Sequence, residues 1–355
     1  MGESVSVPVQ LNAVSTALPP HEAHAAFVRW AQRRITDRRD RILFDRMASR
    51  AGIEQRWTVL PPGADGDQDG DGGFYAHGRM PPTSERMAVY ARSAPDLCVD
   101  AAQGLGSLDG ITHLVMASCT GFIAPGIDQM IARRLGLPGT VERAFLGFMG
   151  CYAAVAALRT AYHIVRSQPD ARVLVITVEL CTLHLQADTA LEPILAMMLF
   201  GDGAAAAIVS AEASGLTLDA PFAATLPGSE DLIRWTIGDH GFAMHLSGAV
   251  PSRIGAALEL PALRAAVGDP GAIDSWAIHA GGRTVLDAVE QGLGLDPAAL
   301  AVSRDVLRAC GNMSSSTLMF VLERILAAPH RAGNGLAMAF GPGLAAEGFR
   351  FKAAV

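Results

Sequence analysis

The sequence predicts an α/β fold made of two similar halves, and three observations support this prediction. First, short apolar runs alternate with helical patterns along most of the chain, which is typical of α/β folds with largely buried sheets. Second, LFGDGAAAAIVS at 199–210 resembles AFGPGLAAEGF at 339–349, with the same spacing of phenylalanine and glycines. Third, Cys151 and Asn312 follow the ends of two apolar runs by 34 and 33 residues. A duplicated α/β unit explains the last two observations.

The individual elements follow from these patterns in chain order. The runs that predict buried strands are 113–117, 172–178, 204–209, 275–279 and 335–340. The helical patterns lie near 126–136, 151–167, 283–294 and 314–328. We expect the two halves to span residues 1–212 and 213–355. In a duplication of this kind, helices that begin at Cys151 and Asn312 meet about a pseudo-twofold axis, with His279 at the end of a strand beside them.

Composition disfavours several classes of protein. Half of the 355 residues are hydrophobic and 18% are charged, which is enough for a large core. The net charge of −7 disfavours nucleic acid as a partner. No uninterrupted run of 18 apolar residues predicts a membrane span, and the N-terminus lacks the pattern of a secretory signal. The five cysteines are odd in number and contain no CxxC pair, so we expect no disulfide framework, no zinc site and a reduced, cytoplasmic setting.

Two charged segments need a separate explanation. Residues 29–50 carry eight arginines against three aspartates, which predicts either a solvated helix with ion pairs or a landing site for phosphates. Residues 61–73 form an acidic, glycine-rich stretch in which Asp65, Asp67 and Asp69 partly match a calcium loop. The twelfth position of such a loop is Ala76 instead of a bidentate glutamate, so we expect a disordered insertion and no calcium site.

The segment GFMGCYAAVAAL at 147–158 places Cys151 where a buried helix is predicted to begin. The positive end of a helix dipole favours thiolate over thiol and so lowers the pKa of the cysteine. A nearby imidazole, His279, would stabilise that thiolate, and the amide of Asn312 would help His279 to hold a developing oxyanion. Taken singly, each of these residues is more often structural. Together they suit acyl transfer through a thioester, although cysteine, histidine and asparagine also occur in cysteine proteases.

From about residue 40 to its C-terminus the chain resembles the type III polyketide synthases, the chalcone and stilbene synthase family of the thiolase superfamily. The motifs that carry the resemblance are SCTGFIAPGID (118–128), GFMGCYAAVAALRTA (147–161), VELCTLH (178–184), LFGDGAAA (199–206), WAIHAGG (276–282), GNMSSST (311–317) and AFGPGLA (339–345). The family's GFGPG loop begins here with Ala339 in place of the first glycine. The resemblance implies a thiolase-like, duplicated αβαβα layered fold.

The resemblance also implies an activity for these residues. Cys151, His279 and Asn312 would be the catalytic triad. Cys151 would take an acyl starter from coenzyme A, and His279 and Asn312 would polarise malonyl-CoA for decarboxylative condensation, after which the polyketide cyclises to an aromatic or a pyrone. The family needs no metal, no redox cofactor and no carrier protein, uses malonyl-CoA and an acyl-CoA starter as substrates, and forms homodimers.

The same resemblance predicts the substrate pocket and the coenzyme A site. Phe200 matches a gatekeeper phenylalanine, and Met244 replaces the second one. Arg46 and Arg50 stand where the family holds the coenzyme A phosphates. The other predicted pocket residues are Cys119, Thr120, Cys181, His184, Trp235 and Ser314.

This pocket departs from that of the plant chalcone synthases. Cys119 and Thr120 occupy a Thr-Ser pair, Cys181 and His184 replace threonines, and Trp235 stands where a glycine is usual. These changes resemble two kinds of bacterial enzyme, the tetrahydroxynaphthalene synthases, which prime with malonyl-CoA, and enzymes with tunnels for long acyl starters. The starter therefore stays open, as does the question whether Trp235 closes or redirects the cavity.

Two other classes of function remain as alternatives. A β-ketoacyl carrier-protein synthase III of fatty acid synthesis is the first, but such enzymes carry glutamine and asparagine after the histidine, where this chain reads HAGG at 279–282. A cysteine hydrolase or a catalytically idle binding protein is the second. Incubation with malonyl-CoA alone discriminates among them, because only a type III polyketide synthase should release CO2 and form a pyrone or aromatic product.

Overall fold

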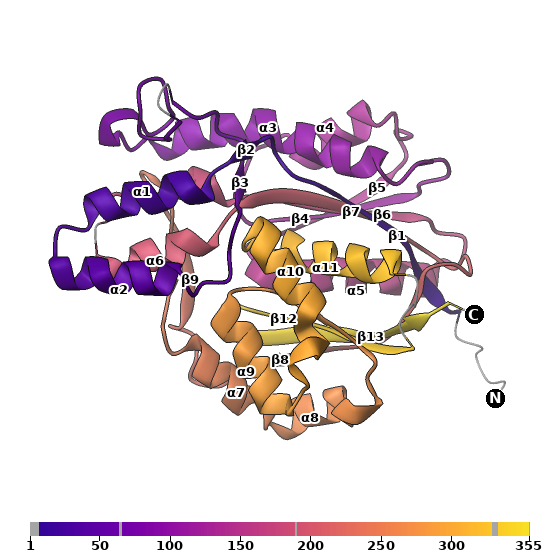
Figure 1. The fold of residues 1–355 in the computed structure, drawn as a ribbon. Coiled ribbons are helices and arrows are strands. Elements are labelled where there is room, and N and C mark those ends of the chain that lie inside the picture. The colour runs from indigo at the N-terminus through magenta and orange to yellow at the C-terminus, as the bar shows by residue number, and fades with distance from the viewer. Residues whose placement is uncertain (1–6, 64–65, 189, 329–332, 355) are drawn as a thin grey trace.

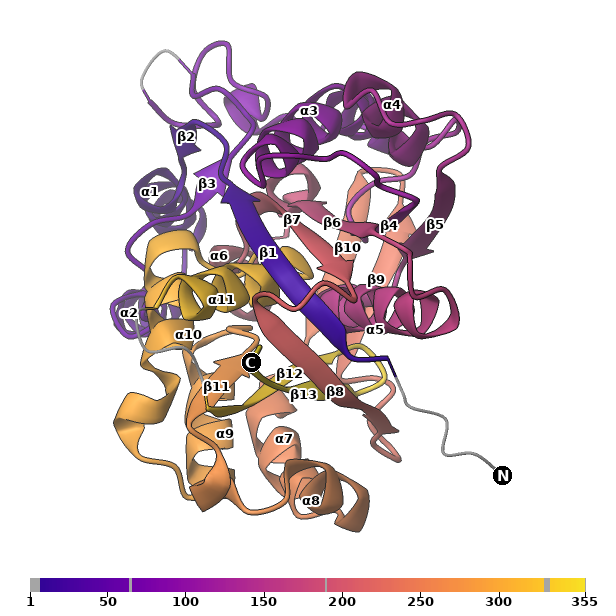
Figure 2. The same ribbon diagram turned by 90° about the vertical axis from the view of Figure 1, so that its right-hand side faces the viewer.

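The computed structural model describes residues 7–63, 66–188, 190–328 and 333–354. A sheet of nine strands runs through the molecule, and the five predicted strands are confirmed within it. In spatial order its strands are β11 (Ser275–Ile278), β12 (Asn334–Gly341), β13 (Ala345–Ala353), β8 (Leu216–Thr225), β1 (Val9–Ala17), β7 (Asp202–Ser210), β6 (Val173–Leu180), β4 (His113–Ser118) and β5 (Glu142–Gly147). The two halves meet where β1 pairs antiparallel with β8, near the middle of the sheet (Figure 2). Most of these strands are buried on both faces, so they read as continuous apolar runs.

Helices divide the molecule into layers (Figure 1). The helices α3 (Thr83–Gln103) and α4 (Ile127–Arg134) cover the outer face of the N-terminal half, and α7 (Val250–Leu258), α8 (Pro261–Val267) and α9 (Arg283–Leu293) cover the outer face of the C-terminal half. Between the halves lie α5 (Ala153–Ser167) and α11 (Ser316–Ala327), with α10 (Ala301–Cys310) beside α11. This is the layered αβαβα arrangement that the sequence predicts.

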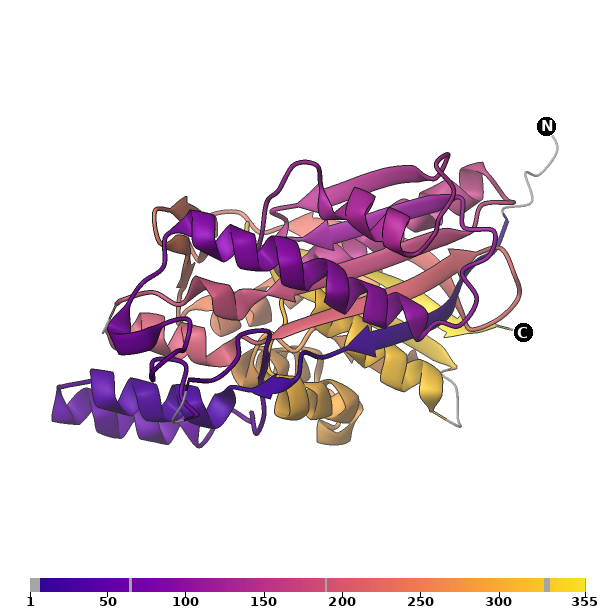
Figure 3. The same ribbon diagram turned by 90° about the horizontal axis from the view of Figure 1, so that it is seen from above.

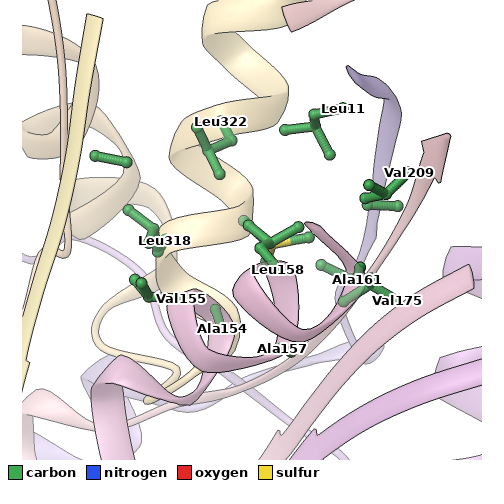
Figure 4. Packing of buried hydrophobic residues seen from close by; sticks show 14 of the residues in the cluster. Leu11, Ala154, Val155, Ala157, Leu158, Ala161, Val175, Val209, Leu318 and Leu322 are labelled. Atoms are coloured by element: carbon green, nitrogen blue, oxygen red, sulfur yellow. The ribbon is translucent and has the colours of Figure 1, made fainter. Parts of the chain in front are cut away.

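The central pair of helices packs closely because one of them is lined with alanine. Every side chain labelled in Figure 4 is fully buried, and those of α5 face those of α11 across the interface. The labelled residues are Ala154, Val155, Ala157, Leu158 and Ala161 on α5, Leu318 and Leu322 on α11, and Leu11, Val175 and Val209 on the neighbouring strands. Small side chains let two helices approach to the short end of the usual interaxial distance. This packing brings the N-terminal ends of both helices to one place.

Three further helices lie at one end of the molecule. The helices α1 (His24–Arg34) and α2 (Arg38–Ala48) run side by side there, next to α6 (Leu191–Leu199) (Figures 1 and 3). The short strands β2 (His21–Glu22) and β3 (Trp57–Thr58) pair with each other, and β9 (Ile233–Gly238) forms a hairpin with β10 (Gly241–Leu246). Single turns of 3₁₀ helix complete the fold: η1 (Ala76–Gly78), η2 (Gly150–Tyr152), η3 (Cys181–His184), η4 (Pro270–Ala272) and η5 (Pro297–Leu300).

The glycine-rich segment from 61 to 73 differs from the prediction. Asp65 lies outside the described residues, but residues 66–73 form successive turns that pack on α1, so the expectation of a disordered insertion is wrong for this part. Glycine is needed for this compact path, because a Cβ on Gly73 would lie 2.3 Å from the carbonyl oxygen of Gln68. The turns place Asp67 and Asp69 against Arg29 and Arg33 of α1, which are ion pairs that the sequence analysis did not predict.

Candidate active site

Cys151 lies in the turn η2, directly before α5. The helix thus begins two residues later than predicted, but Cys151 still sits at its N-terminal end. Gly150 reaches this turn with a φ of 74°, and a Cβ there would lie 2.5 Å from Cδ of Pro342. A Cβ on Gly341 would in turn lie 3.2 Å from the amide nitrogen of Cys151. The loop 341–343 of the second half therefore packs directly on the cysteine, and its glycine and proline explain how it approaches so closely.

Asn312 does not open a helix, contrary to the prediction, because α11 begins four residues later at Ser316. The main chain of Asn312 is hydrogen-bonded to the two neighbours of Phe200 in the sequence. Its N–H donates to the Leu199 carbonyl (2.8 Å), and its carbonyl accepts from the N–H of Gly201 (2.9 Å). The side-chain Oδ1 accepts from the N–H of Ser314 (2.8 Å). These contacts fix the orientation of the amide group before any substrate is present.

The amide of Asn312 lies between the cysteine and the turn that follows the histidine. Its Nδ2 donates to the Gly281 carbonyl (3.0 Å), two residues after His279, and its side chain is close enough to the Cys151 thiol to lower the pKa of that thiol. His279 follows β11 and is anchored by its own N–H, which donates to the Met338 carbonyl (2.9 Å). Asn312 thus lies near Cys151 and the turn after His279, but neither Asn312 nor His279 is among the residues that line the cavity at Cys151.

His279 is 1% exposed, and neither of its ring nitrogens has a hydrogen-bond partner in the described part of the chain. Buried polar groups in native proteins are nearly always hydrogen-bonded, and exceptions often have a catalytic role. Burial lowers the pKa of this imidazole to about 3, so it is neutral at pH 7. A neutral imidazole is able to accept a proton.

The pKa of the Cys151 thiol differs from the prediction. Burial raises it to about 11, and hydrogen bonds with Ser314 and Asn312 offset only part of that increase. The expectation of a lowered pKa is therefore wrong for the Cys151 thiol. A thiolate forms in this site only when another group takes the proton and carries the compensating charge.

Cys151 opens into a cavity of about 30 Å³. Most of the predicted pocket residues line this cavity, namely Cys119, Thr120, Cys181, Phe200, Trp235, Met244 and Ser314. Phe148, Ile233 and Pro342 also line it and were not predicted. Pro342 belongs to the AFGPG motif, so the sequence carried a signal that could have placed it in the pocket. The run 220–250 around Ile233 gave no clear signal for a pocket residue.

Trp235 and Met244 face each other across the hairpin of β9 and β10, where they form a cross-strand pair. The indole Nε1 donates to the Cys119 carbonyl (3.0 Å), which fixes the ring at the edge of the catalytic cavity. The ring also packs edge-on against His184 (5.5 Å between centroids) and Phe242 (6.0 Å). Trp235 is thus a rigid wall.

His184 lies behind that wall and does not line the catalytic cavity. Its Nδ1 accepts from the N–H of Phe242 (3.0 Å), so Nε2 donates to the Thr120 carbonyl (2.7 Å). Its ring stacks on Phe242, and burial lowers its pKa to about 3. With both nitrogens occupied, the imidazole is a structural part of the pocket.

A second cavity of about 100 Å³ adjoins the first. Cys181, Phe200, Trp235 and Met244 line both cavities and form the junction between them. His184 belongs to the wall of the second cavity. Trp235 therefore restricts the catalytic cavity while bordering a larger space on its other side.

Glu179 is a buried residue of the site that the sequence analysis did not single out. Its carboxylate accepts from the Cys119 N–H (3.0 Å), the Thr120 hydroxyl (2.8 Å) and the Ser315 hydroxyl (2.5 Å). Burial raises its pKa to about 7 despite these hydrogen bonds. The signal in the sequence is a single acidic residue at the end of an apolar run, since such a residue must find partners when it is buried.

The arginines of residues 29–50 include residues in two different environments in the structure. Arg29 and Arg33 form ion pairs with Asp67 and Asp69, whereas Arg46 and Arg50 are exposed. The carbonyl of Arg50 accepts from Arg283 at the start of α9 (3.2 Å). The end of α2 thus lies beside the turn that follows His279.

The described residues contain no group of three histidine, cysteine or acidic side chains arranged to hold a metal ion. Within the same ranges, every helix is too short or too polar to cross a membrane.

Comparison with known proteins identifies the family. Residues 8–213 match the N-terminal domain model of the chalcone and stilbene synthases, and residues 218–354 match the C-terminal domain model. The chain is 34% identical over 303 residues to an alpha-pyrone synthesis polyketide synthase-like protein, Pks18, of Mycobacterium tuberculosis, covering 79% of this chain and 76% of that protein. It is 33% identical over 355 residues to the 1,3,6,8-tetrahydroxynaphthalene synthase of Streptomyces peucetius, covering 94% of this chain and 90% of that protein.

Solved structures agree with this assignment. The 1,3,6,8-tetrahydroxynaphthalene synthase of Streptomyces coelicolor, a bacterial type III polyketide synthase, superposes with a TM-score of 0.86 at 26% identity over 98% of this chain and 99% of that one. A polyketide synthase of the brown alga Ectocarpus siliculosus superposes with a TM-score of 0.87 at 27% identity, over 99% of this chain and 100% of that one. These matches favour a polyketide synthase over a β-ketoacyl carrier-protein synthase III. The two domain models and these relatives show that this chain belongs to the chalcone and stilbene synthase family, the type III polyketide synthases.

Proposed function

We propose that Cys151, His279 and Asn312 carry out the acyl transfer and condensation of this type III polyketide synthase. The observation that carries the proposal is the amide of Asn312, which donates to the Gly281 carbonyl in the turn after His279 and lies near enough to Cys151 to lower the pKa of its thiol. The unpartnered, neutral ring of His279 supplies the base. The small catalytic cavity excludes most of the water that would hydrolyse a thioester.

In the loading step, His279 takes the proton of the Cys151 thiol as the sulfur attacks the thioester carbonyl of an acyl-CoA. A new bond forms between Sγ and the acyl carbon, and the bond from that carbon to the sulfur of coenzyme A breaks. The departing thiolate of coenzyme A receives the proton from His279. The amide of Asn312 and the protonated imidazole stabilise the oxyanion in between.

In the extension step, the same two residues bind the thioester carbonyl of malonyl-CoA. The bond to the carboxylate breaks, CO2 leaves, and the electron pair forms an enolate that His279 and Asn312 stabilise by hydrogen bonds. The enolate carbon attacks the acyl group on Cys151, and Sγ departs with the electron pair. Repetition lengthens the chain by two carbons each time, and the polyketide then cyclises to an aromatic or a pyrone.

Coenzyme A thioesters reach the triad along α2. Arg46 and Arg50 are exposed cations on this side, and the Arg50 carbonyl is linked to Arg283 next to the His279 turn. Arginine binds phosphate groups in a fixed geometry, so these residues suit the phosphates of coenzyme A. The enzyme uses malonyl-CoA and an acyl-CoA starter, with no metal or redox cofactor. Its five free thiols fit a reduced, cytoplasmic setting.

The active enzyme is a homodimer in this proposal. Among the described residues, β5 is an edge strand whose one partner is β4, and it carries Phe145, which is 42% exposed. Phe122 (66% exposed) and Phe148 (56% exposed) are also uncovered, and Phe148 lines the catalytic cavity. A second copy that covers this surface would bury the phenylalanines and shield the cavity from solvent.

The test is to incubate purified protein with radiolabelled malonyl-CoA, with and without a panel of acyl-CoA starters, and to identify the products by mass spectrometry. We expect release of CO2 and a pyrone or aromatic product. The Cys151→Ala variant should form no product while its circular dichroism stays that of the wild type. Unchanged synthesis by this variant would overturn the role of Cys151.

A further inference from the structure

Helix α2 is attached to the protein along a narrow strip. Phe44 is its one buried residue and belongs to the same core cluster as Trp30 of α1 and Ile194 of α6. Asp40 and Ala48 are half-buried, and the other residues of the helix are exposed. In both Figure 1 and Figure 2, α2 lies at the periphery of the molecule. Most of the helix surface is therefore free to meet a partner.

The exposed surface of α2 carries aliphatic side chains. Ile42 is 60% exposed, Leu43 42% and Met47 43%. An α-helix turns by 100° for each residue, so Ile42 lies about 200° around the helix from the buried Phe44 and faces away from the protein. Leu43 and Met47 are one turn apart and form a second apolar strip beside it. Apolar side chains that gather on a surface mark a place where another molecule binds.

Arginines surround this apolar face. Arg38 and Arg39 precede Ile42 by four and three residues, and Arg46 follows it by four, so all three lie on the same side of the helix as Ile42. Long arginine side chains extend past a neighbouring apolar residue and place their charge beyond it. The outer face of α2 thus combines an aliphatic centre with a cationic rim.

Several of these arginines have no ion-pair partner. The nearby carboxylates of Asp67 and Asp69 bind Arg29 and Arg33 of α1. In the described part of the chain, the exposed side chains of Arg38, Arg39 and Arg41 form no ion pair. Their charge is available to an external anion.

The charge of α2 is opposite to that of the remaining chain. Residues 38–50 carry five arginines and two aspartates, a net charge of +3. The whole chain carries −7, so the remainder carries −10. An anionic surface attracts this helix and repels the rest of the protein, which favours one orientation of docking.

The combination of charge and apolar side chains selects the kind of partner. Basic helices with exposed aliphatic residues bind at the interface of anionic bilayers, where the apolar side chains enter the boundary between headgroups and acyl chains. The arginines then lie at the level of the lipid phosphates. A nucleic acid would match the charge but would offer no apolar phase to Ile42 and Leu43. The observations therefore favour a lipid surface.

We propose that the outer face of α2, formed by Arg38, Arg39, Arg41, Ile42 and Leu43, docks on the surface of a bilayer that contains anionic phospholipids. The arginines bind lipid phosphates, and Ile42 and Leu43 enter the headgroup boundary. The inference does not depend on the chemistry proposed for Cys151.

The experiment measures co-sedimentation of the full-length protein with vesicles of phosphatidylcholine that contain about 30% phosphatidylglycerol, and with vesicles of phosphatidylcholine alone. We expect binding to the anionic vesicles, little binding to the neutral ones, and loss of binding in about 0.5 M NaCl. Each arginine near an anionic surface contributes about fivefold to the partition coefficient. The triple variant Arg38→Gln, Arg39→Gln and Arg41→Gln should therefore bind at least about tenfold more weakly.

The matched control for charge is the triple variant Arg92→Gln, Arg133→Gln and Arg166→Gln, which removes three exposed arginines from α3, α4 and α5. It has the same net charge as the α2 variant and should bind as the wild type does. All of the substituted side chains are exposed, and circular dichroism of each variant should match that of the wild type.

The apolar contribution is tested separately. Ile42→Gln with Leu43→Gln should lower the partition coefficient at least about tenfold without changing the net charge, because the aliphatic groups no longer enter the bilayer. Ile42→Leu keeps an aliphatic side chain at this position and should retain binding.

Three results would overturn the inference. The first is a wild type that does not bind the anionic vesicles. The second is equal weakening by the two triple variants, since binding would then follow net charge and not the face of α2. The third is unchanged binding of the Ile42→Gln and Leu43→Gln variant, which would show that the surface attracts anions by charge alone. Each of these results leaves the proposed acyl transfer untouched.

Discussion

The protonation of Cys151 gives a direct test of the role of His279. Beside a neutral imidazole, burial places the pKa of this thiol at about 11. A group with that pKa is ionised in about one molecule in ten thousand at pH 7. An imidazolium about 4 Å from the sulfur would stabilise the thiolate by about 4 kcal/mol at an effective dielectric constant near 20, or ~3 pKa units, which recovers part of the cost that the lowered pKa of His279 sets on accepting the proton.

We therefore expect His279→Ala to slow alkylation of Cys151 by iodoacetamide at pH 7, because no imidazole is left to take the proton of the thiol. In the variant the rate should rise tenfold for each pH unit and show no plateau below pH 9, since only hydroxide is left to take the proton. The rate is followed by peptide mapping of Cys151, so that the other four thiols do not contribute.

His163→Ala is the matched control, because His163 is exposed on the same helix that follows Cys151. This variant should keep the wild-type rate at every pH. Equal alkylation of wild type and His279→Ala at pH 7 would refute the reasoning, and so would a plateau in His279→Ala that begins at or below pH 7.

The remaining predictions concern the walls and supports of the site. Gly150→Ala should destabilise the protein by about 1–3 kcal/mol in urea unfolding, because its Cβ would meet Pro342 at 2.5 Å and its φ is 74°; unchanged stability would contradict this contact. Trp235→Ala should join the two cavities and change the product profile by mass spectrometry, with a loss of up to about 3 kcal/mol in stability; an unchanged profile would show that Trp235 does not divide the space. Burial raises the pKa of Glu179 from 4.5 to about 7, so the folded state favours the protonated carboxyl, and stability present below pH 4.5 should be lost, by ~3 kcal/mol, as pH rises to about 7. Glu179→Gln should remove this pH dependence in urea unfolding, and an identical pH profile in wild type and variant would show that Glu179 is not its source.

The fold was largely predictable because its signals are local. Buried strands such as 172–178 and helices such as 283–294 appear as apolar runs and periodic patterns, and the structure confirms both. The start of α11 was placed too early because Gly311-Asn312 looks like a helix start. The main chain of Asn312 bonds to Leu199 and Gly201 instead, and this long-range pairing leaves no trace in the local pattern.

The sequence by itself determined the family of this protein, the duplicated α/β halves and the identity of the three candidate catalytic residues, because motifs and spacing are properties of the chain. The tertiary structure alone decided the charge state of the site, since the pKa values of Cys151 and His279 depend on how completely other segments exclude water from them. It also decided where Trp235 stands and how Asp67 and Asp69 pair with arginines of α1. Both answers depend on contacts between segments far apart in the chain, and no local pattern of residues encodes such contacts.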